Sequence, residues 1–84
     1  MNVQPNDLLT HKLQTLIANG LQLPSEQITF GLSFGDIPQW DSMGHMEIML
    51  LLEAEYGVEI NPNTITTLTS IERITRHLKE NGYA

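Results

Sequence analysis

Ser42 is the residue of this chain whose setting most suggests chemistry. It follows Asp41, a good N-cap residue, and precedes a long apolar run, so its hydroxyl is predicted at the first position of a helix, facing solvent. A group attached to that oxygen would lie over unpaired N–H donors at the positive end of the helix dipole. Such an environment suits an anionic phosphate ester. The alternative interpretation is that Asp41 and Ser42 only begin a helix.

His45, three residues after Ser42, lies on the next turn of the same predicted helix. The pair could be a nucleophile and its base, but no third residue is evident to orient the imidazole and no oxyanion hole is suggested. The three histidines fall in three different predicted elements, and the carboxylates after Ser42 are spread along an exposed face, which argues against a metal site. The sequence therefore predicts no enzyme. It predicts a serine offered to the active site of another protein.

The first part of the chain is predicted to form a helix and a long loop. Leucine and isoleucine recur at helical spacing after Asn6 or Asp7, either of which can cap the helix, and Asn19-Gly20 ends it. From Leu21 to Gln39, glycines and prolines are spread among scattered apolar residues, and residues 25–28 suggest a short helical turn. A loop of this length in a small domain is expected to pack as an ordered, functional segment.

Three further helices are predicted after this loop. The second helix covers residues 41–56, and Pro62 opens a short third helix through about Leu68. Thr69, with Glu72 three residues later, forms a capping-box pattern that opens the fourth. The prediction is an all-α four-helix bundle with three longer helices, one short third helix and a long loop between the first two.

Helix 41–56 is predicted to have two different apolar sides. A turn of about 100° per residue gives a core side and a second side that mixes large apolar side chains with carboxylates. One interpretation is that other helices bury the second side as well, because Met is a common core filler. The other is a docking face, on which methionines give adaptable contact area and glutamates meet Lys or Arg of several partners. The core set is Ile48, Met49, Leu52 and Tyr56, and the mixed set is Met43, Met46, Glu47, Leu50, Glu53 and Ala54.

The composition narrows the classes of function. The 84 residues predict a single domain, 1–84, and the absence of cysteine excludes disulfides, thiolate catalysis and Cys-ligated zinc and is compatible with a cytoplasmic protein. Ten acidic against four basic residues argue against nucleic-acid binding and predict partners with basic surfaces, whose recruitment weakens as salt rises. No secretory signal or membrane-length apolar stretch is apparent, so a soluble protein without membrane insertion is expected.

The residues around Ser42 also match a family. Asp41-Ser42-Met43 resembles the Asp-Ser-Leu signature of acyl carrier proteins. The chain from Trp40 to about Leu78 is similar to the second, third and fourth helices of that family, and the first helix and loop fit by position and length. The setting of the tripeptide strengthens the resemblance: the apolar helix that follows it, residues 55–60 after that helix, and the start of the last helix.

The resemblance implies a bundle of the acyl-carrier type in which Ser42 bears 4′-phosphopantetheine, attached from coenzyme A by a phosphopantetheinyl transferase. The terminal thiol of the arm would hold acyl intermediates as thioesters for acyl-activating and acyl-processing enzymes with basic docking surfaces. A monomer is expected. By matching position, acidic contacts with partners fall to Asp41, Glu47 and Glu53, and apolar contacts fall to Met43, Met46 and Leu50.

Four positions depart from the pattern of fatty-acid-synthesis carriers. Trp40 stands where those usually have a small residue, and Gly44-His45 replaces their usual acid-and-polar pair. The acidic cluster at the end of helix 41–56 is also thinned by Ala54. These features resemble stand-alone carriers of specialised biosynthetic pathways. The alternative from another class is an unmodified small helical interaction module that docks through helix 41–56.

Overall fold

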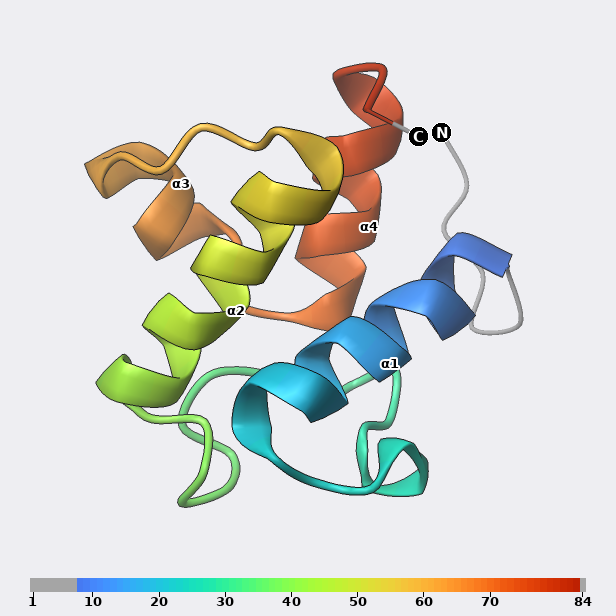
Figure 1. Ribbon diagram of the computed structural model, residues 1–84, viewed down its shortest axis with the longest axis vertical. Coiled ribbons are helices and arrows are strands. Elements are labelled where there is room, and N and C mark those ends of the chain that lie inside the picture. Colours follow the sequence, from blue (N-terminus) through green and yellow to red (C-terminus); the bar gives the residue numbers. More distant parts are fainter. Residues whose placement is uncertain (1–7, 84) are drawn as a thin grey trace.

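The computed structural model describes residues 8–83, and helices account for most of them (Figure 1). Within these residues no strand forms, and one isolated β-bridge pairs Ser33 with Ser70. The predicted all-α bundle with a short third helix and a long first loop is therefore confirmed. The elements are α1 (Leu8–Leu21), the 3-10 helix η1 (Ser25–Gln27), α2 (Ser42–Tyr56), α3 (Pro62–Thr67) and α4 (Ile71–Glu80).

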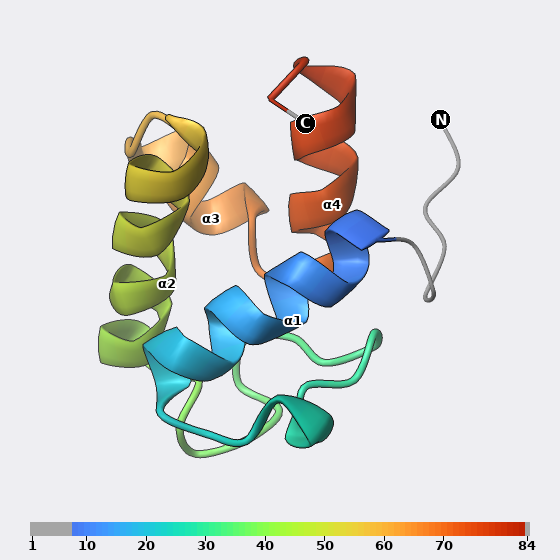
Figure 2. The ribbon, with the colours of Figure 1, turned by 45° about the vertical axis from the view of Figure 1, so that its right-hand side comes forward.

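The helices surround one core. In Figures 1 and 2, α1 crosses α2 and α4 obliquely, and α3 lies beside α2 on the side away from α1. Trp40, just before α2, is completely buried in this core. The other fully buried apolar side chains are Leu13, Ile17, Ile28, Ile48, Met49, Leu52, Val58, Leu68, Ile71, Ile74 and Leu78.

Local signals fix both ends of α2 where the sequence predicts them. Asp41 has extended backbone angles and its side chain accepts a hydrogen bond from the N–H of Gly44. At the other end Gly57 adopts the left-handed conformation, with φ of 74°, and its N–H bonds the carbonyl of Glu53. Glycine adopts this geometry without steric penalty, which explains why the helix stops there.

The end of α1 differs from the prediction. The helix continues through Gly20 to Leu21, and Gln22 takes the left-handed turn, with φ of 59°. A β-carbon at Gly20 would lie 3.2 Å from Cγ1 of Ile48 on α2, so this glycine serves the close approach of two helices. Leu21 is buried, and its burial favours one more helical residue. The predicted caps at the start of this helix, residues 6–7, lie outside the described residues.

The start of α4 also differs by one residue. Ser70 is the N-cap, and its hydroxyl accepts a hydrogen bond from the N–H of Arg73. The predicted cap, Thr69, instead accepts the N–H of Phe34 at its carbonyl, over 2.8 Å. This bond ties the long loop to the start of α4. A contact between segments so far apart along the chain is invisible to a local capping pattern.

The long loop packs as predicted. Ile28 and Leu32 are buried beneath α1, and η1 forms at the expected short turn. The side-chain amide of Gln14 on α1 donates a 2.7 Å hydrogen bond to the carbonyl of Ile28. The packed loop therefore fixes the positions of Trp40 and of the start of α2.

Candidate functional site

Ser42 is the first residue of α2, and its side chain is exposed. Asp41 accepts the N–H of Gly44 at Oδ1 over 2.8 Å, and its carbonyl accepts the N–H of His45 over 2.8 Å. The N–H groups of Ser42 and Met43, at the first two helical positions, have no acceptor within the helix and can face an anion on Ser42. The hydroxyl thus lies at the positive end of a fifteen-residue helix, as predicted.

A compact turn holds the chain in place just before Ser42. The carboxylate of Asp36 accepts the N–H and the hydroxyl of Ser33, at 2.9 and 3.2 Å. The N–H of Gly35 donates to the carbonyl of Trp40, and the N–H of Trp40 donates to the carbonyl of Ile37. Gly35 has φ of 87°, a conformation that side chains rarely adopt. These bonds orient the chain entering α2.

His45 is buried, with 3% of its surface exposed, and both ring nitrogens are engaged. The indole Nε1–H of Trp40 lies 3.1 Å from Nδ1, and the carbonyl of Ile65 on α3 lies 2.8 Å from Nε2. Indole can only donate and a carbonyl can only accept, so the neutral ring carries its proton on Nε2. In this state no nitrogen is free to take a proton from Ser42. The geometry therefore opposes a Ser42–His45 catalytic pair.

A pocket of about 340 Å³ lies beside Ser42, between the long loop, α2 and α3. Its surface is mostly apolar. The sequence does not predict this pocket, because its wall combines residues from the long loop, α2, α3 and the connection between α3 and α4, which no local pattern joins. Phe34, Ser42, His45, Met46, Ile65, Thr66 and Thr69 line it.

The mixed side of α2 is exposed, as the docking-face interpretation predicts. Met43 is 77% exposed, Leu50 49% and Met46 36%, and Glu47 and Glu53 also face solvent. The alternative, that other helices bury Met43 and Met46, is therefore wrong. The predicted core side is confirmed for Ile48, Met49 and Leu52, which are completely buried, whereas Tyr56 is only partly buried.

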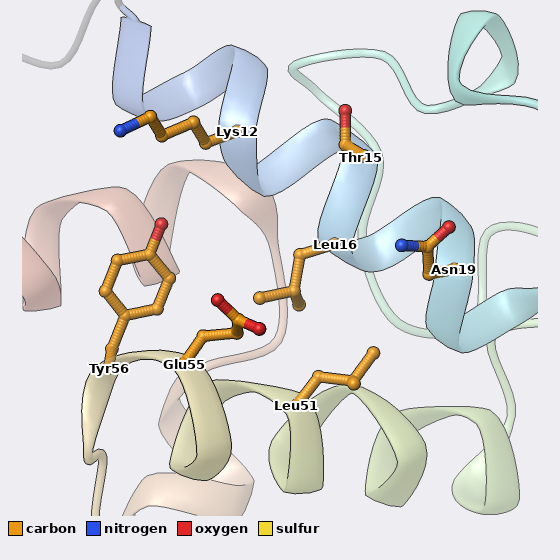
Figure 3. A pocket seen from close by; sticks show the side chains of 7 residues that line it. All are labelled: Lys12, Thr15, Leu16, Asn19, Leu51, Glu55 and Tyr56. Atoms are coloured by element: carbon orange, nitrogen blue, oxygen red, sulfur yellow. The ribbon is translucent and has the colours of Figure 1, made fainter.

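A larger pocket, of about 530 Å³, lies between α1 and the C-terminal part of α2 (Figure 3). Tyr56 and Glu55 extend there from α2 toward α1. Burial raises the pKa of the Tyr56 hydroxyl above its ordinary value of 10.0, and the neighbouring Glu55 carboxylate raises it further. Ser42 is at the opposite end of α2, so this pocket is separate from the serine site. Its lining residues are Lys12, Thr15, Leu16, Asn19, Leu51, Glu55 and Tyr56.

Comparison with known proteins decides the family. The family described as "Phosphopantetheine attachment site" matches residues 11–78. The chain belongs to this family. This phosphopantetheine-binding chain is a carrier rather than an enzyme, as predicted, and its cofactor is 4′-phosphopantetheine. The alternative of an unmodified interaction module is not favoured.

Curated relatives support the same assignment. The acyl carrier protein of Phytoplasma australiense is 28% identical over 88% of this chain and 97% of its own length. Those of Rickettsia bellii and Rickettsia massiliae are 27% and 26% identical, over 88% of this chain and 91% and 86% of their own lengths. No solved structure matches the chain significantly.

The site fits a phosphopantetheine group. Ser42 offers an exposed hydroxyl at a helix start, where N–H groups and the helix dipole favour a phosphate. The apolar pocket beside it suits the hydrocarbon parts of the arm. When bound, the group supplies a thiol that can hold an acyl group as a thioester, which this cysteine-free chain cannot supply itself. Among residues 8–83, no cluster of potential ligands could hold a metal ion, and no helix is long and apolar enough to cross a bilayer.

Proposed function

We propose that Ser42 is the attachment residue for 4′-phosphopantetheine and that the protein presents acyl thioesters on this arm to partner enzymes. The observation that carries the proposal is the position of Ser42. Its exposed side chain is at the first position of α2 and lines the apolar pocket. The two residues before it are held in place, because Trp40 is buried in the core and Asp41 caps the helix. A modifying enzyme can reach this hydroxyl without unfolding any part of the bundle.

The other serines are less suited to modification. Ser33 donates its hydroxyl to the carboxylate of Asp36, and Ser70 uses its hydroxyl to cap α4. Ser25 begins η1, a three-residue helix whose dipole is too short to stabilise a phosphate strongly. Ser42 combines exposure, a long helix and a neighbouring pocket.

The attachment reaction assigns different roles to the carrier, which supplies the hydroxyl of Ser42, and to the phosphopantetheinyl transferase. Oγ of Ser42 forms an ester bond to the phosphorus that carries pantetheine, the phosphoanhydride bond of coenzyme A breaks, adenosine 3′,5′-bisphosphate leaves with the bonding electron pair, and the hydroxyl proton passes to a base. His45 is held by Trp40 and the carbonyl of Ile65, so it does not accept this proton. The general base therefore belongs to the transferase.

The decisive experiment incubates the protein with coenzyme A and a promiscuous phosphopantetheinyl transferase and then measures its intact mass. We expect one added phosphopantetheinyl group on the wild type and none on Ser42→Ala. Ser25→Ala is the matched control, and it should load like the wild type. No added group on the wild type, or a group that persists on Ser42→Ala, would refute the assignment.

The exposed side of α2 is proposed as the docking face for the transferase and for acyl-activating and acyl-processing enzymes. Its carboxylates suit basic partner surfaces, and its methionines and leucine suit apolar pockets at the centre of an interface. The exposure of these side chains supports this assignment. The proposed contact residues are Asp41, Met43, Met46, Glu47, Leu50 and Glu53.

Charge reversal at Glu47 tests the electrostatic part of the docking face. We expect Glu47→Lys to raise the KM of the transferase for this carrier several-fold at low salt and less at high salt, because salt screens exposed charges. Glu26→Lys, an equally exposed position on η1, is the control and should change KM little. Equal losses at both salt concentrations would argue against electrostatic docking.

The remaining parts of the proposal concern the setting of the carrier. A single domain over residues 1–84 is supported by the one core on which α1, α2, α3 and α4 pack. We expect a monomer by light scattering and a cytoplasmic location, with which the lack of cysteine is compatible. Trp40, Gly44 and His45 support assignment to a specialised pathway rather than to general fatty-acid synthesis.

A further inference from the structure

The imidazole of His45 stands between the pocket beside Ser42 and the bundle core. On one side its ring lines the pocket, with the edge of Phe34 at a centroid distance of 5.4 Å and an interplanar angle of 81°. On the other side its edge meets the indole of Trp40 through the hydrogen bond to Nδ1, with the ring centroids 6.3 Å apart and the planes inclined by 27°. Trp40 is completely buried and belongs to the core. The ring therefore separates two apolar regions.

The same ring also bridges two helices. His45 belongs to α2, and its Nε2–H donates to the carbonyl of Ile65 on α3. A chain leading from Ser42 into the bundle between α2 and α3 would meet this bridge. None of the seven residues that line the pocket is a member of the buried hydrophobic core, although the partly buried Ile65 packs against it. The pocket therefore lies outside the core, and His45 and Ile65 close its inner end.

Opening this inner end would break one buried and one partly buried hydrogen bond. If the imidazole moved aside, the indole N–H of Trp40 and the carbonyl of Ile65 would both lose their partner. Buried polar groups without partners are strongly unfavourable. A hydrocarbon chain offers no donor or acceptor to replace the ring. These two hydrogen bonds therefore keep the imidazole of His45 in place when an apolar acyl chain is present.

We propose that His45 determines cargo specificity by closing the pocket beside Ser42 against the core. The inference rests on attachment of the arm at Ser42, because that residue lines the pocket. A short acyl group can lie against Met46 and Phe34 in the pocket, whereas a chain that outgrows the pocket cannot extend past His45 to bury its distal part in the bundle core. The carrier thus favours short acyl groups and keeps longer chains exposed.

The test loads the wild-type protein with acetyl, butyryl, hexanoyl and octanoyl arms from the corresponding acyl-coenzyme A compounds. Intact mass reports loading first: failure to load at Ser42 overturns the attachment proposal and the closure that rests on it, whereas loading followed by the spectral changes described below overturns the closure alone. Trp40 is the only tryptophan of the chain, so its indole N–H gives a unique NMR signal. We expect the methyl signals of Met46 and Ile65 to shift with acetyl and butyryl and then stop changing. The Trp40 indole signal should stay constant through octanoyl.

A progressive shift of the Trp40 indole and of core methyls, such as those of Leu52, with increasing chain length in the wild type would overturn the proposal. That result would show cargo entering the bundle. The wild-type series alone decides whether cargo enters the bundle, so this test does not depend on the folding of any variant.

Variants connect the effect to His45. His45→Ala removes the ring, and we expect the Trp40 signal and the melting temperature to change with chain length beyond butyryl. His45→Gln keeps a similar bulk with one donor and one acceptor, and we expect it to restore the wild-type plateau. His11→Ala, at an exposed histidine on α1, is the matched control. A folded His45→Ala protein that reproduces the wild-type plateau would also refute the proposal.

Discussion

Replacement of Gly44 by alanine is expected to destabilise this protein, contrary to the usual effect of that substitution in a helix. Gly44 is buried in the first turn of α2. A β-carbon there would collide with the backbone oxygen of Gln39 and would lie 2.8 Å from Cδ2 of Leu21. The residue therefore allows the loop and the end of α1 to pack directly on the helix that begins at Ser42.

The size of the effect follows from two opposing contributions. Alanine gains up to about 1 kcal/mol over glycine from helix propensity. Overpacking costs about 1–3 kcal/mol. The upper value applies because the clashing atom is the backbone oxygen of Gln39, which cannot rotate aside as a side chain can. This backbone is also fixed by the next residue, Trp40, which is buried. The net loss is about 2 kcal/mol of unfolding free energy. In a domain of this size it lowers the melting temperature by about 8–16 °C.

Thermal unfolding followed by circular dichroism measures this change directly. Gly31→Ala is the matched control, because a β-carbon at Gly31 would have no neighbour within 4 Å, and we expect its melting temperature to stay within a few degrees of wild type. The rate of Ser42 modification should fall for Gly44→Ala, since a shift of Gln39 moves the start of α2. A Gly44→Ala protein as stable as the wild type would refute the packing argument.

Three other predictions concern α2. Asp41→Ala should lower the unfolding free energy by about 1 kcal/mol through loss of the cap to Gly44, whereas Asp41→Asn should retain it in denaturant titrations; equal losses would contradict the capping role. Because the pKa of Tyr56 is raised in the folded state, the fold holds that proton more tightly than the unfolded chain, so stability should fall as pH rises above about 10. Tyr56→Phe should remove this part of the pH dependence, and an unchanged slope in unfolding experiments would disprove it. Met43→Ser should change the melting temperature little, because the side chain is exposed, but should weaken transferase binding measured by calorimetry; normal binding would remove Met43 from the docking face.

The sequence was sufficient to predict α2 and its two sides because their signals are local. Asp41 and Gly57 act within one turn of the helix ends, and the apolar spacing alone separates Ile48 and Leu52 from Met43. Ser42 could be placed at a helix start for the same reason.

The features that the sequence did not predict depend on contacts between distant segments. The sequence predicts that Gly20 ends a helix, whereas in the structure this glycine lets α2 approach closely. It also predicts that Thr69 caps α4, whereas the carbonyl of Thr69 accepts the N–H of Phe34. The pocket beside Ser42 and the bond from His45 to Ile65, twenty residues away, require the packing of α3 on α2. Pairing of this kind leaves no periodic pattern in a single sequence.

The three unusual residues near Ser42 depend on one another physically. The indole N–H of Trp40 is buried and needs an acceptor, which Nδ1 of His45 provides. The ring of His45 can meet Trp40 because the first turn of α2 lies against the loop, and Gly44 permits that approach. Replacing any one of them alone would leave a buried polar atom unpaired or would push the loop away from the helix. Ser42 is therefore presented to solvent by a turn whose inward residues, Gly44 and His45, form one packing unit with Trp40.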